Sequence, residues 1–426
     1  MSPSQRPPAP GAGAGPTRPQ WQGLALAGLA VVMVALAVGP VLRGLLTPPS
    51  RRTQVATPTR VRVAPGPRLC RGAGGLASGA LQLFPPDTGW VLGAAGAGLA
   101  TPLLWTGDGG AHWRVASPPG GGTVYAACFA SARSGWVVTW HPNTAAAGPF
   151  RLWSTADAGH TWQPGGRIPV PAWYAGAPQS PGELDFVNAK DGWLFAPEAA
   201  DGEPVLGLLF ATRDGGRHWT ARPGPYSEPE WVRFTASQTG FGPRLHGPWA
   251  EALVRTVDGG RTWAPVQGLP AWGYQARCDP SVGLPTFVSA SRGWVPVAWA
   301  PGPLSRATGC FALAVYATRD GGRHWSLADV APHLIAATRF LTLEVVGPRD
   351  WIVPGDPAPV FYRSVDGGHH WAAVRMHGLA GLQPTGPPRF VTGTLAWLGA
   401  MNPRTFRFVL LRSRDGGRDW RPVRIP

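Results

Sequence analysis

The 426-residue sequence has few acidic residues and few cysteines, and it lacks the short motifs of common catalytic and metal sites. Asp and Glu total 23 against 38 Lys and Arg, which gives a formal net charge of +15, carried almost wholly by arginine. The four cysteines form no C-x-x-C pair, so a structural zinc site and a thioredoxin-like redox site have no support. H-E-x-x-H, G-x-S-x-G and P-loop motifs are also absent. No long helical periodicity follows residue 46, which argues against a helical domain.

Glycine, proline and tryptophan are abundant, and an eight-residue phrase recurs seven times. The chain has 59 Gly, 49 Pro and 22 Trp, and 44% of its residues are hydrophobic, enough to bury a large core. Each phrase has Ser or Thr first, Asp third, Gly fifth and Trp eighth. The copies are TGDGGAHW (106–113), TADAGHTW (155–162), TRDGGRHW (212–219), TVDGGRTW (256–263), TRDGGRHW (318–325), SVDGGHHW (364–371) and SRDGGRDW (413–420). Such a recurrence, with the Asp residues 44 to 62 residues apart, is typical of a repeat architecture.

The phrase has the chemistry of a tight turn between two strands. An Asp side chain accepts bonds from backbone N–H groups just after it, and the glycines allow φ > 0 at little cost. The Trp then opens the next strand, with its ring free to pack between sheets. The aspartates and tryptophans are therefore predicted to be structural. They are Asp108, Asp157, Asp214, Asp258, Asp320, Asp366 and Asp415, and Trp113, Trp162, Trp219, Trp263, Trp325, Trp371 and Trp420. The pattern resembles the Asp-box, or BNR repeat.

A second phrase precedes every copy of the first. It is an apolar segment that ends in a Gly-Trp-like pair, as in FPPDTGWVL (84–92), and it looks like two short strands joined by a polar turn. Together the two phrases supply four strands per repeat, which is one propeller blade. We therefore expect an all-β fold, a seven-bladed β-propeller over residues 73–426.

The N-terminal 72 residues divide into three predicted segments. Residues 1–20 are Pro, Gly and Ala-rich with two arginines and no acid, so we expect a disordered basic tail. Residues 21–46 contain an uncharged stretch, 23–42, about as long as a bilayer core is thick, and we expect one transmembrane helix that serves as a signal anchor. A cleaved signal peptide is the alternative, because Ala35-Leu36-Ala37 resembles a cleavage site. Residues 47–72 are expected to form a Pro/Arg-rich linker.

An anchor of this kind usually exports the chain that follows it, so the propeller is expected on the extracytoplasmic side of the cell membrane, as a single-pass protein. Export permits two disulfides among four cysteines. We expect the pairs Cys70–Cys128 and Cys278–Cys310, because the members of each pair fall in neighbouring or identical repeats. Four separate buried thiols are the alternative.

Two surfaces are candidates for binding. The loops opposite the Asp-containing turns include long links that are rich in aromatic residues, and such residues suit a protein or glycan partner. These candidate partner-binding residues are Trp140, Trp173, Tyr174, Trp272, Tyr274 and Trp299. The alternative is that they fold down over the blade ends. On the other face, the repeated phrases add seven arginines that either meet an anionic surface or are simply solvated. They are Arg213, Arg217, Arg261, Arg319, Arg323, Arg414 and Arg418. No nucleic-acid-binding motif is present.

An enzyme is not expected. A glycosidase needs two carboxyl groups across a cleft, and the spacing of the acidic residues outside the repeated phrases singles out no pair. The loose candidates are Glu183, Asp185, Glu198, Asp201, Glu203, Glu228, Glu230, Glu251 and Asp279. The Arg-Ile-Pro motif of sialidases occurs only at residues 424–426, at the wrong end of the chain. His-Trp pairs recur at one strand position and are assigned to the scaffold. We expect no catalytic residues, cofactor or metal.

The alternation of F-x(n)-GWVV with [ST]-x-DGG-x-x-W over residues 80–426 resembles the photosystem II stability/assembly factor family and its non-photosynthetic relatives. That resemblance implies a seven-bladed, exported propeller that acts as a non-catalytic scaffold. It carries over no partner-binding residue and no photosystem partner. The prediction is a membrane-anchored propeller that binds another protein; the alternative is a glycan-binding or glycan-cleaving propeller.

Overall fold

The computed structural model describes residues 81–84, 87–92, 102–141, 150–171, 182–196, 207–225, 231–245, 251–269, 281–298, 312–335, 341–355, 359–379 and 381–425. Within these ranges the chain forms thirty strands and no helix, which confirms the all-β prediction. No helix among them is long and apolar enough to span a bilayer. The predicted tail, membrane segment and linker (1–72) lie outside these ranges.

The strands make seven antiparallel sheets, each built from consecutive strands. Blades 1 to 3 are β1 (Leu81–Phe84), β2 (Thr88–Leu92), β3 (Leu103–Thr106), β4 (Arg114–Val115); β5 (Thr123–Phe129), β6 (Gly135–Trp140), β7 (Phe150–Thr155), β8 (Gln163–Arg167); and β9 (Glu183–Phe186), β10 (Gly192–Ala196), β11 (Leu208–Thr212), β12 (Thr220–Arg222). Blades 4 and 5 are β13 (Arg233–Phe234), β14 (Gly240–Leu245), β15 (Glu251–Thr256), β16 (Ala264–Pro265); and β17 (Ser281–Val282), β18 (Thr286–Phe287), β19 (Gly293–Ala298), β20 (Ala312–Thr318), β21 (Ser326–Ile335). Blades 6 and 7 are β22 (Glu344–Val345), β23 (Trp351–Pro354), β24 (Val360–Ser364), β25 (Ala372–Arg375); and β26 (Gln383–Pro384), β27 (Arg389–Phe390), β28 (Ala396–Met401), β29 (Phe408–Ser413), β30 (Arg421–Val423).

Blades 5 and 7 differ from the expected four strands because their innermost strand is split in two. Both β17 and β18 pair with β19, and both β26 and β27 pair with β28. The break in blade 5 contains Pro285 and the break in blade 7 contains Pro387 and Pro388. Proline has no N–H to donate to a ladder, so each split falls where the chain cannot pair continuously.

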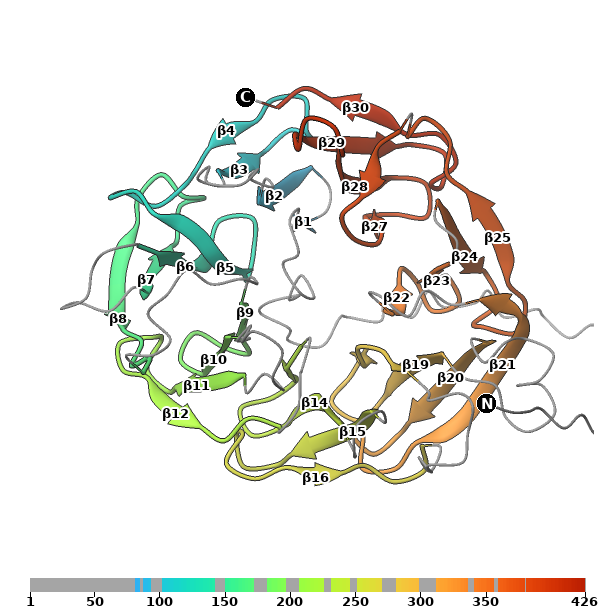
Figure 1. Ribbon diagram of the computed structural model, residues 1–426, viewed down its shortest axis with the longest axis horizontal. Helices are drawn as coiled ribbons and strands as arrows, with labels where there is room; N and C mark the ends of the chain where they lie inside the picture. The colour runs from blue at the N-terminus through green and yellow to red at the C-terminus, as the bar shows by residue number, and fades with distance from the viewer. Residues whose placement is uncertain are drawn as a thin grey trace, which may run out of the picture. The chain divides into compact units, whose positions relative to one another are not determined.

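The blades form a ring in which the first strand of each blade lies nearest the centre and the last lies at the rim (Figure 1). Blade 7 meets blade 1 through side chains, with no strand exchanged between them among the described residues. Trp397 contacts Trp113 edge-to-face at 6.0 Å, and Arg412 donates from Nη1 to the Gly109 carbonyl at 3.0 Å. The seven-bladed β-propeller prediction is confirmed.

An aromatic pair joins the two blades at every one of the seven seams. The ring centroids of these pairs lie 3.8 to 6.0 Å apart. In order around the ring the pairs are Trp90–Phe129, Trp136–Phe186, Trp193–Phe234, Phe241–Phe287, Trp294–Trp351, Phe361–Phe390 and Trp397–Trp113. In the first four pairs, the Gly-Trp-like aromatic of one blade stacks on the Phe that ends the inner strand of the next. The second phrase thus supplies most of the aromatic rings that meet between blades.

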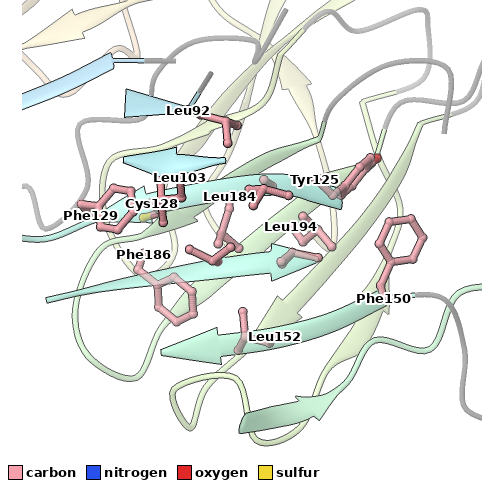
Figure 2. Close-up of a cluster of buried hydrophobic side chains, with 14 of the residues drawn as sticks. Leu92, Leu103, Tyr125, Cys128, Phe129, Phe150, Leu152, Leu184, Phe186 and Leu194 are labelled. Carbon is pink, nitrogen blue, oxygen red and sulfur yellow. The ribbon is translucent and has the colours of Figure 1, made fainter. Parts of the chain in front are cut away.

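The largest apolar cluster spans three blades (Figure 2). Leu92 and Leu103 come from blade 1, Phe129 and Phe150 from blade 2, and Phe186 from blade 3. A core that crosses seams buries its apolar surface only when neighbouring blades pack together. Burial in this region therefore stabilises the ring as well as each sheet.

The turns inside each blade define two faces. In every blade the residue after the repeated Asp donates its backbone N–H to a carbonyl in the first hairpin turn, as Gly109 does to Asp87 at 2.6 Å. The other six donors are Ala158, Gly215, Gly259, Gly321, Gly367 and Gly416. Both turns therefore share one face, here called the turn face. The middle turn of each blade, such as that between β2 and β3, is here called the second hairpin turn. This turn and the links between blades begin and end at the opposite face, here called the link face.

Candidate functional site

Each copy of the eight-residue phrase folds into the same hydrogen-bonded unit, here called the repeat turn. In blade 1, Thr106 Oγ1 donates to Asp108 Oδ1 at 2.9 Å and accepts the N–H of Gly110 at 2.9 Å. The His112 N–H donates to Asp108 Oδ1 at 2.9 Å. The pattern recurs around Asp157, Asp214, Asp258, Asp320, Asp366 and Asp415. These carboxylates bond the backbone of their own turns.

The second carboxylate oxygen is also engaged. In four repeat turns Oδ2 lies 2.6 Å from Nδ1 of the histidine before the Trp, namely His112, His218, His324 and His370. Thr161 and Thr262 donate their hydroxyls at the same position in blades 2 and 4. The His-Trp pairs are thus placed beside the turn aspartates. Among the described residues no group of three or more His, Cys, Asp or Glu is arranged to hold a metal ion.

These bonds favour the charged carboxylate. The backbone N–H of His112 and then its ring nitrogen lower the pKa of Asp108 to about 2, and Asp157 and Asp366 shift in the same direction for the same kind of reason. In the remaining four aspartates, burial is the largest single effect and raises the pKa. The hydrogen bonds together outweigh burial, so the pKa is lowered in these residues as well. These are Asp214, Asp258, Asp320 and Asp415.

We expect stability to fall steeply in acid. Because the folded pKa of each turn aspartate lies below the unfolded value of about 3.9, its contribution is fully present above that value and is lost as the pH falls through the folded value. Urea midpoints measured from pH 5 down to pH 2 should decline, most sharply below about pH 4. An Asp108→Asn variant should lose less over the same range. A flat pH profile would contradict this account of the turns.

The repeat-turn tryptophans pack close to their own turns. Trp219, Trp325 and Trp420 are buried, and the other four are half-buried. The indole N–H groups of Trp219 and Trp420 donate to the carbonyls of Gly216 and Gly417 in the same turns. That of Trp263 reaches the Pro223 carbonyl of the preceding blade at 3.0 Å.

Of the six candidate partner-binding aromatics, the structure describes only Trp140, at the end of β6. It is half-buried and packs against the cluster of blades 1 to 3, close to the interpretation in which these rings fold over the blade ends. Trp173, Tyr174, Trp272, Tyr274 and Trp299 lie outside the described residues. Cys128 is buried and disulfide-bonded; Cys70, Cys278 and Cys310 also lie outside, so neither predicted pairing is tested.

The seven arginines of the repeat turns are exposed on the turn face, as the spacing predicts. Some are held locally. Arg213 pairs with Asp191 at 3.2 Å and lies over the Trp193 ring at 4.9 Å. Arg261 and Arg418 donate to the carbonyls of Asp258 and Asp415 in their own turns.

Two acidic residues from the loose candidates have a role that sequence reasoning missed. Asp185 and Glu183, both buried on β9, accept the backbone N–H groups of Phe234 and Val232 in the next blade at 3.0 and 2.9 Å. Asp185 Oδ2 also lies 3.5 Å from Arg233 Nε. Burial raises the pKa of Asp185, and Arg233 opposes that shift. The signal was present in the sequence: acids alternate with apolar residues in ELDF, so that both point to one side of a strand.

Acceptors of the same kind occur at other seams. Gln82 accepts the N–H of Phe129 at 3.1 Å, and Glu344 accepts that of Phe390 at 3.0 Å. In these positions a side chain bonds the inner backbone edge of the neighbouring blade's first strand, an edge that no other described strand pairs with. The described inner-strand acids are thus engaged in holding blades together.

The fold and these sites define the chain as a seven-bladed β-propeller whose repeat-turn carboxylates bond their own backbones. No known protein family and no curated protein matches it. Among solved structures it is similar to YCF48 from Cyanidioschyzon merolae, at 15% identity over 78% of this chain and 94% of that chain, with a TM-score of 0.44. It is also similar to a GH74 xyloglucanase from Xanthomonas campestris (15% identity, 85% and 63% of the chains, TM-score 0.31) and to a PL25 ulvan lyase (11%, 68% and 80%, 0.41). Similarity at this level transfers neither an activity nor a partner.

Proposed function

We propose that this chain is an Asp-box propeller of the assembly-factor-like kind: a non-catalytic, membrane-anchored scaffold that binds a protein partner outside the cytoplasm. The observation that carries the proposal is the state of the carboxylates. The seven that the repeats present on the turn face bond their own backbones. The described inner-strand acids Glu183, Asp185 and Glu344 bond the next blade. These groups serve rigidity, which suits a binding platform.

The extracytoplasmic location is supported by Cys128. Its sulfur is disulfide-bonded, and such bonds persist mainly in oxidising compartments. The uncharged stretch 23–42 provides the proposed anchor.

The link face is the proposed binding surface, because it carries the connections that differ most in length from blade to blade. Two of the long links contain Trp173 and Trp272. In the full-length chain, cross-linked in its native membrane and recovered with its neighbours, one protein should co-purify reproducibly with the wild type. Its recovery should fall at least about tenfold with Trp173→Ala and Trp272→Ala together, the loss expected of an aromatic hot spot.

The matched control for this experiment is Arg217→Gln with Arg261→Gln on the turn face, which should leave recovery unchanged. Hydrolysis or retention of a defined glycan by the wild type, lost in the Trp variant while no protein co-purifies, would replace the scaffold with the glycan-active alternative.

A further inference from the structure

Residues 402–407 form the turn between β28 and β29, which lies on the link face of blade 7 and is described from end to end. The Asn402 N–H donates to the Arg407 carbonyl at 2.9 Å, and the Phe406 N–H donates to the Asn402 carbonyl at 2.8 Å. Asn402 Oδ1 accepts the N–H groups of Arg404 and Thr405 at 2.9 and 3.3 Å. Hydrogen bonds within the turn therefore set its shape.

Both the backbone conformation of Phe406 and the exposure of its ring are unfavourable in a protein without a partner. Its φ is +52°, a left-handed conformation that is uncommon for a bulky residue, and its side chain is 59% exposed. The other large hydrophobic side chains exposed among the described residues are aliphatic, and none of them has a positive φ. Backbone strain that presents an aromatic ring to solvent indicates a functional position.

The surroundings of Phe406 are basic. Arg404 and Arg407 flank it and are exposed. Leu410 pairs with Val423, so the chain after β30 runs toward the same end of the blade and brings the exposed Arg424 there. Neither 396–411 nor 421–425 contains an acidic residue. The acids of blade 7, Asp415 and Asp419, lie in the repeat turn on the opposite face.

We propose that residues 403–407 form a membrane-contacting tip, with Phe406 inserted into the interface of an anionic lipid bilayer and Arg404 and Arg407 on the lipid phosphates. The tip is an exposed turn with one aromatic ring between two cations, a combination that suits a soft anionic surface. Arginine forks onto phosphate oxygens while its stem lies along apolar surface. The uncharged stretch 23–42 is independently suited to hold the chain at a bilayer.

The expected strength is modest. Each arginine near an anionic surface contributes about fivefold to partitioning, and partial burial of the Phe406 ring about tenfold. Such a tip holds a protein only when another element already keeps it nearby, which raises the effective concentration. The tip would therefore set how an anchored propeller is oriented, with blade 7 toward the bilayer.

The test uses the full chain reconstituted in vesicles of phosphatidylcholine with or without phosphatidylglycerol. Hydrogen exchange at the amides of residues 404–408 is expected to slow in the anionic vesicles only. Phe406→Asn should reduce that protection about tenfold, since Asn accepts the left-handed backbone and keeps the turn. Arg404→Gln with Arg407→Gln should reduce it about 25-fold. The matched control, Arg217→Gln with Arg261→Gln on the turn face, should behave as wild type.

A photo-cross-linking amino acid at position 406 separates a lipid from a protein occupant. Cross-links to lipid in native membranes support the proposal. Cross-links to one protein, or equal protection in neutral and anionic vesicles, overturn it. Neither result bears on whether Trp173 and Trp272 bind a partner, so the two proposals fail separately.

Discussion

Trp193→Ala is expected to destabilise the propeller by about 4 kcal/mol, as is usual for deleting a buried tryptophan. Trp193 is 1% exposed and stacks on Phe234 of the next blade with centroids 3.8 Å apart. Its indole N–H donates to the Gly259 carbonyl at 3.1 Å, in the repeat turn of that blade. The substitution therefore removes packing and a hydrogen bond across a single seam. Guanidinium unfolding, followed by tryptophan fluorescence and circular dichroism, measures the change.

Phe406→Asn is the matched control, because it also removes an aromatic ring but from an exposed position. Its effect on the unfolding free energy should lie within about 0.5 kcal/mol. A loss below about 1 kcal/mol for Trp193→Ala would show that the stacked seams contribute little to stability. Separation of the fluorescence and dichroism transitions in that variant would instead show that blades unfold independently once one seam is weakened.

The ring could be predicted from sequence because its turns have strict local requirements. In blade 1 both glycines of the repeat turn have positive φ, +67° and +78°, where a side chain is strained. Blade 2 shows how strong the template is: Ala158 replaces the first glycine and still adopts a φ of +66°. Local chemistry of this kind is visible in a window of eight residues, so the number of blades follows from counting.

The seams could not be predicted in the same way, because they depend on which side chains meet across distant segments. The ELDF pattern places Asp185 on one side of its strand, but it does not identify Phe234, 49 residues away, as the partner. The two inner strands are split at prolines. The prolines are visible in the sequence, but whether they interrupt a strand depends on the strand with which that segment pairs. For the candidate site, the sequence predicts that six aromatic residues lie on one face. Of these six, only Trp140 falls within the described residues. The exposure and positive φ of Phe406 could not be predicted, because neither leaves a mark in composition.

Asp185→Ala is expected to lower the free energy of unfolding by about 3 kcal/mol, a large effect for one side chain. The Phe234 N–H would lose its acceptor at a buried seam, which costs about 1–3 kcal/mol. Arg233, whose side chain is 13% exposed, would also lose the Asp185 oxygen that lies 3.5 Å from its Nε. Asp185→Asn keeps an oxygen for the Phe234 N–H and should cost about 1 kcal/mol. Equal losses in the two variants would show that the charge, rather than the acceptor, holds the seam.

The pH dependence distinguishes these roles further. Burial raises the folded pKa of Asp185 above the unfolded value of about 3.9. The folded state then binds its proton more tightly, so the stability due to this group is greatest below that value and is lost as the pH rises through the folded pKa. This slope is opposite in sign to that of the repeat-turn aspartates. The unfolding free energy of Asp185→Asn should therefore improve relative to the wild type as the pH rises from 4 toward neutrality. A difference that stays constant over this range would mean that Arg233 keeps Asp185 ionised throughout, and that the seam contains a true ion pair.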